Sequence, residues 1–287
     1  MERELWLILY HIALECDQLS KARYRPAVIV GVYCWAVLHD RPVCWACERR
    51  NWPESLFDEP CFCLPSQSTM SRRLGRPDTE QVLDQASALL VEAWAFCWVK
   101  IIDAKPLSIG GFSKDGDARW GRSVKGIAKG YKLYAIWGRG AMPVVWGLAS
   151  MNVGEATMAR RMIALLEGGG YLLGDCQYDS NALHALAREH GYQLVAPRKK
   201  PGTGLGHRAH ATERLRALEL LHTPFGHALF NHRSHIERNL AWLTNCAGGL
   251  QPLPAWVRRF HRVRLWVYAK LLLNALRHSP STTHALA

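Results

Sequence analysis

The chain has 287 residues, enough for one large domain or for a catalytic domain with a smaller companion, and it can bury a core without disulfides. Its formal charge of +12 is unevenly distributed. Residues 196–287 hold 14 Lys and Arg against 3 Asp and Glu, whereas residues 1–195 hold 22 against 21. A basic surface of this kind suits a polyanion, because each neutralised phosphate releases counterions. The alternative is a basic surface that only keeps the chain in solution.

No segment has the roughly 18 consecutive apolar residues of a membrane span. The N-terminal sequence MERELWLILYHIALEC carries acidic residues and no small-residue cleavage site. We therefore expect a cytoplasmic protein without a membrane partner. The nine cysteines are odd in number and scattered, which argues against a disulfide framework.

Four cysteines, however, lie close together in the sequence, spaced CxxC and then CxC: Cys44, Cys47, Cys61 and Cys63. Four thiolates suit tetrahedral zinc, so a small structural zinc site is one interpretation. The second pair is tighter than the usual zinc spacing, and free thiols are the other interpretation.

The N-terminal region is predicted to be helical. Residues 1–40 read as two helices joined near 21–26, and a short helix follows at 66–74. Ser66 is a suitable N-cap for this short helix, and its surface carries Gln67, Arg72 and Arg73. Small polar groups and arginines are typical of a helix that reads DNA, but a short basic surface helix has the same composition.

The remainder alternates strands with helices, which predicts an α/β fold with a mixed sheet covered by helices. Residues 108–130 and 198–212 are polar and rich in glycine, and we expect loops there, the second of them basic and mobile. Helices are predicted at about 78–97, 155–167, 179–190, 211–222, 231–246 and 254–278, and strands at about 98–103, 131–137, 143–150, 171–175 and 192–197.

Three acidic residues occupy positions that suit a metal site: Asp103 and Asp175 each end an apolar run, and Glu237 lies in a predicted helix that carries arginine. Magnesium and manganese prefer oxygen ligands. Two such ions, ~3.5–4 Å apart, support in-line displacement at a phosphate. The pattern therefore favours phosphodiester chemistry. Taken singly, either aspartate could be an ordinary turn or capping residue, and Asp179, just before a helix, is interpreted as an N-cap.

In the helix predicted at about 231–246, with Phe230 just before it, Phe230, Arg233, Glu237 and Thr244 share one face. A metal-binding carboxylate beside a phosphate-binding guanidinium is the functional interpretation. An ordinary surface ion pair between positions i and i+4 is the structural one.

Four sequence elements together resemble a known family, the DDE-type transposases of bacterial insertion sequences. These elements are IIDAK at Asp103, GYKLYAIW at Gly130, GDCQYDS at Asp175 and RSHIE at Glu237. The last element is similar to the branch of the family with a Tyr-x2-Arg-x3-Glu-x6-Lys signature. In this chain Phe230 stands in place of the Tyr and Thr244 in place of the Lys. The resemblance implies an RNase-H-like catalytic core at 98–287, preceded by a helical DNA-binding region at 1–97.

The resemblance further implies an enzyme that cleaves element ends and joins them to target DNA, with two Mg²⁺ or Mn²⁺ ions held by Asp103, Asp175 and Glu237. Its partner would be DNA, bound by a homodimer associated with the bacterial nucleoid. The residues expected to contact DNA or its phosphates are Arg233, Lys132, Arg72, Arg73, Gln67, Lys199 and Lys200. Two alternatives stay open: a nuclease of the same fold without strand transfer, and a catalytically degenerate DNA-binding derivative. The DNA sequence recognised is not readable from the chain.

Overall fold

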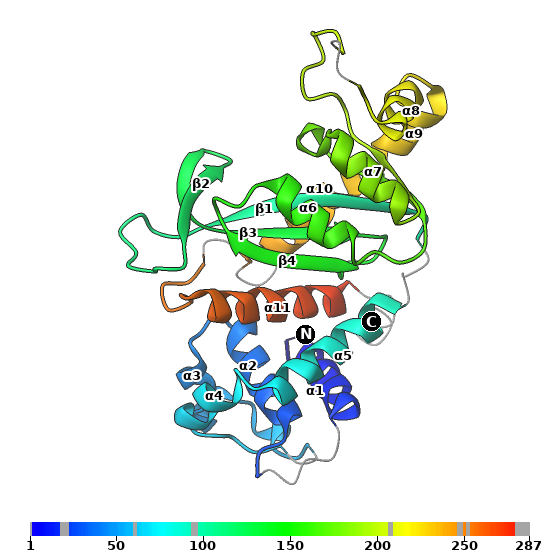
Figure 1. Cartoon of the computed structure of the whole chain (residues 1–287). Helices are drawn as coiled ribbons and strands as arrows, with labels where there is room; N and C mark the ends of the chain where they lie inside the picture. The colour runs from blue at the N-terminus through cyan, green and yellow to red at the C-terminus, as the bar shows by residue number, and fades with distance from the viewer. Residues whose placement is uncertain are drawn as a thin grey trace. The chain divides into compact units, whose positions relative to one another are not determined.

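The computed structural model describes residues 2–17, 23–59, 62–92, 97–205, 209–245, 249–250 and 253–278. The chain forms two compact units (Figure 1). The helical unit comprises residues 1–93 and 242–287, and the sheet unit comprises residues 94–241. The C-terminal residues are thus grouped with the N-terminal helices, whereas the sequence suggested a division at 97/98. As a division into functional domains, 1–97 and 98–287 stays a prediction.

The helical unit contains the two predicted N-terminal helices and the predicted short helix. Its elements are α1 (Glu2–Cys16), α2 (Pro26–Leu38), α3 (Val43–Ala46), α4 (Gln67–Arg73), α5 (Pro77–Glu92) and α11 (Phe260–Arg277), with 3₁₀ turns η1 (Arg49–Asn51) and η2 (Glu54–Leu56). Every residue of α2 is buried, as expected of a helix that is apolar on all sides. Gly31 allows α1 to approach, since a Cβ there would lie 2.9 Å from the Tyr10 ring.

An aromatic cluster forms the centre of this unit. Trp6 stacks on Tyr10 with ring centroids 4.9 Å apart, and meets Trp35, Trp52 and Phe62 edge to face. Aromatic pairs in these geometries contribute about 0.5–1.5 kcal/mol each beyond the burial of their surface. The many tryptophans of the N-terminal region therefore serve the core of the unit.

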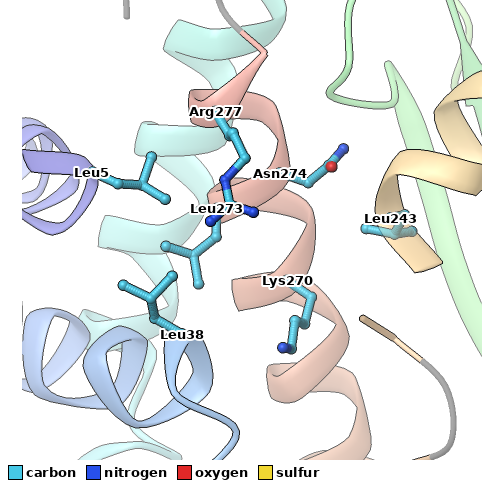
Figure 2. Close-up of a pocket in the computed structure, with 7 residues that line it drawn as sticks. All are labelled: Leu5, Leu38, Leu243, Lys270, Leu273, Asn274 and Arg277. Atoms are coloured by element: carbon cyan, nitrogen blue, oxygen red, sulfur yellow. The ribbon is translucent and has the colours of Figure 1, made fainter. Parts of the chain in front are cut away.

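Helix α11 brings polar groups into this unit. Lys270 Nζ donates to Asp40 Oδ1 at 2.6 Å, and the Tyr268 hydroxyl donates to Asp84 Oδ1 at 2.7 Å. A cavity of about 20 Å³ is lined by Lys270, Asn274 and Arg277 together with four leucines, and Figure 2 shows Asn274 pointing toward Leu243, away from Leu5 and Leu38. The Asn274 Oδ1 is buried without a hydrogen-bond partner among the described residues. None of the described helices is long and apolar enough to cross a membrane.

The sheet unit is built on one mixed six-stranded sheet. The strand order is β2 (Arg119–Ser123), β3 (Gly126–Trp137), β1 (Val99–Ser108), β5 (Gly170–Leu173) and β6 (Tyr192–Val195), and β4 (Val145–Ser150) pairs with the second half of β3. Strands β2, β3, β4 and β1 pair antiparallel, whereas β1, β5 and β6 run parallel. The prediction of a mixed α/β fold is confirmed.

Helices cover both faces of this sheet (Figure 1). They are α6 (Glu155–Ile163) and α7 (Asn181–Glu189) on one face, and on the other α9 (Pro224–Asn231) and α10 (Ser234–Asn245), with α8 (Thr212–Leu220) beside β6. Neighbouring residues of β1 show the alternation: Ile102 packs with Met158 of α6, and Ile101 packs with Ile236 of α10.

Two predictions about the strands were wrong. Strand β1 does not end at Asp103 but continues to Ser108, because the residues after Asp103 pair with β3. The predicted loop at 108–130 contains β2 and the start of β3. Gly121 and Gly130 pack against backbone there, where a Cβ would lie 2.3 Å and 2.2 Å from carbonyl oxygens. This hairpin is largely exposed, so it lacks the apolar alternation that marks a strand.

The predicted helix at 231–246 is also interrupted. Phe230 belongs to α9, Arg233 lies in the turn after it, and α10 begins at Ser234. The N–H groups of Arg233 and Ile236 donate to the carbonyls three residues earlier, as in a 3₁₀ turn, instead of four residues earlier. The sequence suggested that Phe230 and Glu237 share one face of a regular helix. This prediction was wrong.

Candidate active site around Asp103 and Asp175

Asp103 and Asp175 occupy equivalent positions on neighbouring parallel strands. The last parallel pair of β1 and β5 is Ile101 with Leu173, and each aspartate lies two residues beyond it. β5 has ended at that point, and Asp175 caps the 3₁₀ turn η3 (Cys176–Tyr178). The two carboxylates thus come from adjacent strands at the same height of the sheet, which is the relationship that a shared site requires.

A local backbone hydrogen bond holds each of the two carboxylates. The Ala104 N–H donates to Asp103 Oδ1 at 2.8 Å, and the Gln177 N–H donates to Asp175 Oδ1 at 2.8 Å. In each residue one oxygen is therefore held by a backbone N–H, and Oδ2 has no hydrogen bond among those the structure gives for the described residues. Side chains fixed in this way are suited to a site that must not rearrange when it binds.

Burial raises the pKa of Asp103 to about 6. The Ala104 N–H and the positive charge of Arg233 lower this pKa, whereas the negative charges of Asp175 and Glu155 raise it. A carboxylate whose ionised form is disfavoured by burial and by like charges gains from a bound cation. The electrostatics of Asp103 therefore suit a cation-binding role.

The Tyr178 side chain lies within this group of carboxylates. It is 1% exposed, and its hydroxyl has no hydrogen-bond partner among the described residues. Burial, followed by the charges of Asp103, Glu155 and Asp175, raises its pKa well above the ordinary value. Gly174 makes room for the ring, since a Cβ there would lie 2.9 Å from it. A neutral phenol with an unpaired O–H group is thus buried beside the acidic residues.

Glu155, the first residue of α6, was not predicted from the sequence, yet its charge acts on Asp103 and Tyr178. Its carboxylate accepts an ion-pair hydrogen bond from Lys132 Nζ at 3.3 Å. The Lys132 residue is only 7% exposed. From the sequence, Lys132 is predicted to bind phosphate. In the structure Lys132 lies beside the acidic group and is paired with Glu155. The GYK sequence gives no indication of this pairing.

Glu237 differs from the two aspartates in its surroundings. It lies in the first turn of α10 and is exposed. It is not one of the charges named above that act most strongly on Asp103. Arg233 is half-buried, and its Nε has no hydrogen-bond partner among the described residues. The structure thus places Arg233 near Asp103, while Glu237 is presented to solvent.

In the part of the chain that the structure describes, no three His, Cys, Asp or Glu residues form a group that could hold a metal ion. The two aspartates offer oxygen ligands that suit a divalent cation, and the charge of Asp175 acts on Asp103. The three predicted ligands, however, are not assembled into one group. The same finding applies to zinc for Cys44, Cys47 and Cys63, and Cys61 lies outside the described residues. Without a metal, burial raises the pKa of the Cys47 thiol to about 11.

The sequence suggested that Asp179 is the N-cap of α7, and this prediction was wrong. Ser180 caps the helix by accepting from the Leu183 N–H at 3.3 Å. Asp179 instead forms a buried ion pair with Arg214 of α8. Its carboxylate therefore has a structural partner, which sets it apart from Asp175.

The remaining predicted DNA contacts are mostly exposed. Ser66 caps α4 as predicted, and Gln67 and Arg72 lie at the surface. Arg73 is less available, since it donates to Asp78 at 3.2 Å. The loop lysines, Lys199 and Lys200, are exposed.

Comparison with known proteins identifies the family. Residues 94–273, more than half of the chain, match the family described as the transposase DDE domain. The chain belongs to this family, which indicates a transposase: an enzyme that cleaves and joins DNA, with DNA as its partner. No curated protein and no solved structure matches the chain.

Proposed function

We propose that the protein cleaves the ends of a bacterial insertion sequence and transfers the freed strands to target DNA in a metal-dependent reaction. The observation that carries this proposal is the equivalent placement of Asp103 and Asp175 beyond one parallel strand pair. An RNase-H-like core is part of the proposal. Its support is a sheet in which antiparallel strands β4, β3 and β1 are followed by parallel strands β5 and β6.

Mg²⁺ or Mn²⁺ is the proposed cofactor, with two ions held by Asp103, Asp175 and Glu237. Bound there, the metal would activate a water or a 3′-hydroxyl and stabilise the leaving oxygen. The raised pKa of Asp103 and the backbone hydrogen bond that holds each of the two carboxylates support the first two ligands. Glu237 would be the third ligand by its place in the RSHIE element.

The chain's own residues divide the remaining tasks. Arg233, close enough to lower the pKa of Asp103, would orient a phosphate, because a guanidinium can bind two of its oxygens. Lys132 holds Glu155 in place. Exposed Lys199 and Lys200 would contact the DNA backbone. On α4, Gln67, Arg72 and Arg73 would contact the element's ends, and paired ends lead us to propose a homodimer on DNA.

A cleavage assay tests this proposal. The substrate is a plasmid carrying the two DNA sequences that flank the coding region in its genome, incubated with protein and Mg²⁺ or Mn²⁺. Asp175→Asn should abolish cleavage and spare DNA binding, and Arg188→Gln, an exposed change on α7, should spare both. Undiminished cleavage by Asp175→Asn would contradict the metal assignment. Cleaved products without joined products would indicate a nuclease, and metal-independent binding without cleavage would indicate a regulator.

A further inference from the structure

The helical unit contains a second, larger pocket that has no part in the proposed cleavage chemistry. It lies where α3 and α4 meet the segment leading into α11, and its volume is about 270 Å³. A water molecule occupies about 30 Å³ of liquid, and ligand pockets begin near 300 Å³. The pocket is therefore of a size that accepts one small organic ligand.

The charged groups around this pocket are all basic. Arg41, His261 and Arg262 line it, and no Asp or Glu is among its lining residues. All three side chains are exposed. Among the described residues, neither guanidinium has a carboxylate partner within ion-pair distance. Two guanidinium groups without an acidic partner favour an anionic ligand, and a phosphate most of all.

The walls of the pocket suit a planar group that accepts hydrogen bonds. Trp256 is 44% exposed and offers a face for stacking. Trp266 is 2% exposed, and its Nε1–H has no partner among the described residues. A buried tryptophan N–H usually donates to something, so a ligand with an acceptor would satisfy it. Gln67 and Ser71 of α4 add polar groups to the same wall.

We propose that this pocket binds a single nucleotide, with the base against Trp256 and the phosphate on Arg41 and Arg262. The nucleotide has two chemical sources: an unpaired residue of a DNA strand, or a free mononucleotide. This inference shares with the proposed function DNA as the partner and Gln67 of α4 as a contact, and it does not depend on the metal site.

Fluorescence anisotropy in EDTA tests the pocket apart from cleavage. The probes are a fully paired duplex and the same duplex with a short unpaired 3′ extension. Arg41→Gln with Arg262→Gln should weaken binding of the extended duplex about tenfold or more, and of the paired duplex about twofold or less. The control, Arg3→Gln with Arg50→Gln, removes two exposed arginines that do not line the pocket and should change neither affinity.

A second variant fills the pocket without removing charge. Ser71 is exposed on α4, so Ser71→Trp should fold normally and should block the extended duplex selectively. A deoxynucleoside monophosphate is then added to compete with the extended duplex. If it competes, and if the same variants abolish the competition, the pocket also binds free nucleotides. If it does not compete, the nucleotide comes from the unpaired strand. Equal weakening of both duplexes, or no weakening of either, overturns the proposal. Asp175→Asn should bind both probes like the unchanged protein, so failure of the cleavage proposal would be seen separately.

Discussion

Asp179 and Arg214 form an ion pair with two hydrogen bonds, 2.6 Å from Nε and 2.7 Å from Nη2 of the arginine. The Asp179 side chain is 1% exposed and lies four residues after Asp175. The same carboxylate accepts from the Lys199 N–H at 3.2 Å. This pair therefore ties both ends of the basic 198–212 segment to the chain just after the candidate active site.

Arg214→Met should destabilise the sheet unit strongly, because it leaves the Asp179 carboxylate buried without its partner. Breaking a buried pair from one side costs about 3–5 kcal/mol. Urea unfolding at pH 7 measures the change, with Arg188→Met on the surface of α7 as control. The double variant Asp179→Asn/Arg214→Met should recover part of the loss. A loss below about 1 kcal/mol, the usual value of a surface pair, would contradict this account.

The sequence could not identify this pair because its two members are 35 residues apart. An aspartate before a helix has the local appearance of an N-cap, and Ser180 fills that role instead. The same limit applies to Lys132 and Glu155, which are 23 residues apart. Local patterns name residues that suit a helix start or a strand end, whereas ion-pair partners depend on how the sheet and helices pack.

His184 should make stability depend on pH. Burial lowers the pKa of this fully buried residue to about 4, although Asp179 acts in the opposite direction. The unfolded chain, with an ordinary histidine pKa near 6.5, then binds more protons than the folded chain between pH ~4 and ~6.5. The contribution of His184 to stability should therefore fall as pH is lowered through this window, by up to about 3 kcal/mol, opposite in sign to the contribution of Asp103. Urea unfolding at pH 7, 5.5 and 4.5 measures it.

A His184→Gln variant separates this effect from other titrating groups. The difference in unfolding free energy between the unchanged protein and this variant should shift by up to about 3 kcal/mol in favour of the variant as pH falls from 6.5 to 4.5. An unchanged slope would show that His184 is not the group responsible.

Asp103→Asn should stabilise the metal-free protein at neutral pH while abolishing cleavage. Burial first, and then the charges of Asp175 and Glu155, raise the folded pKa of Asp103 to about 6. A raised carboxyl pKa contributes stability at low pH that is lost as pH rises through about 6, so the ionised residue is a cost at pH 7. The gain should be about 1–3 kcal/mol at pH 7.5 and close to zero below pH 4. A loss of thermal stability at pH 7.5 would contradict the account.

The positions of Asp103 and Asp175 could be predicted from the sequence, because both follow apolar runs, whereas their role as metal ligands stays a prediction. Their common register beyond Ile101 and Leu173 required the strand pairing. Glu155 was not recognised because the first residue of a helix is often acidic for electrostatic reasons alone. The break before α10 was missed because one i→i−3 turn leaves no mark in an amphipathic pattern.

Tyr178→Phe should distinguish a structural ring from a functional hydroxyl. The hydroxyl is buried without a partner among the described residues, so its removal should raise stability by about 1–3 kcal/mol. If the hydroxyl donates to a bound phosphate or water, cleavage should fall while stability rises. Gly174→Ala is the packing control: its Cβ would lie 2.9 Å from the Tyr178 ring, and it should cost about 1–3 kcal/mol.

The third carboxylate can be assigned by comparing Glu237→Gln with Glu155→Gln. If Glu237 is a ligand, its variant should lose cleavage as completely as Asp175→Asn, with little change in stability because the residue is exposed. Glu155→Gln removes the partner of the buried Lys132, so it should be less stable but retain cleavage within about 10–100-fold. The reverse result would assign the third position to Glu155, whose charge already acts on Asp103 and Tyr178. Mn²⁺ titration by calorimetry gives a readout independent of cleavage, since the variant that lacks a ligand should bind the ion more weakly.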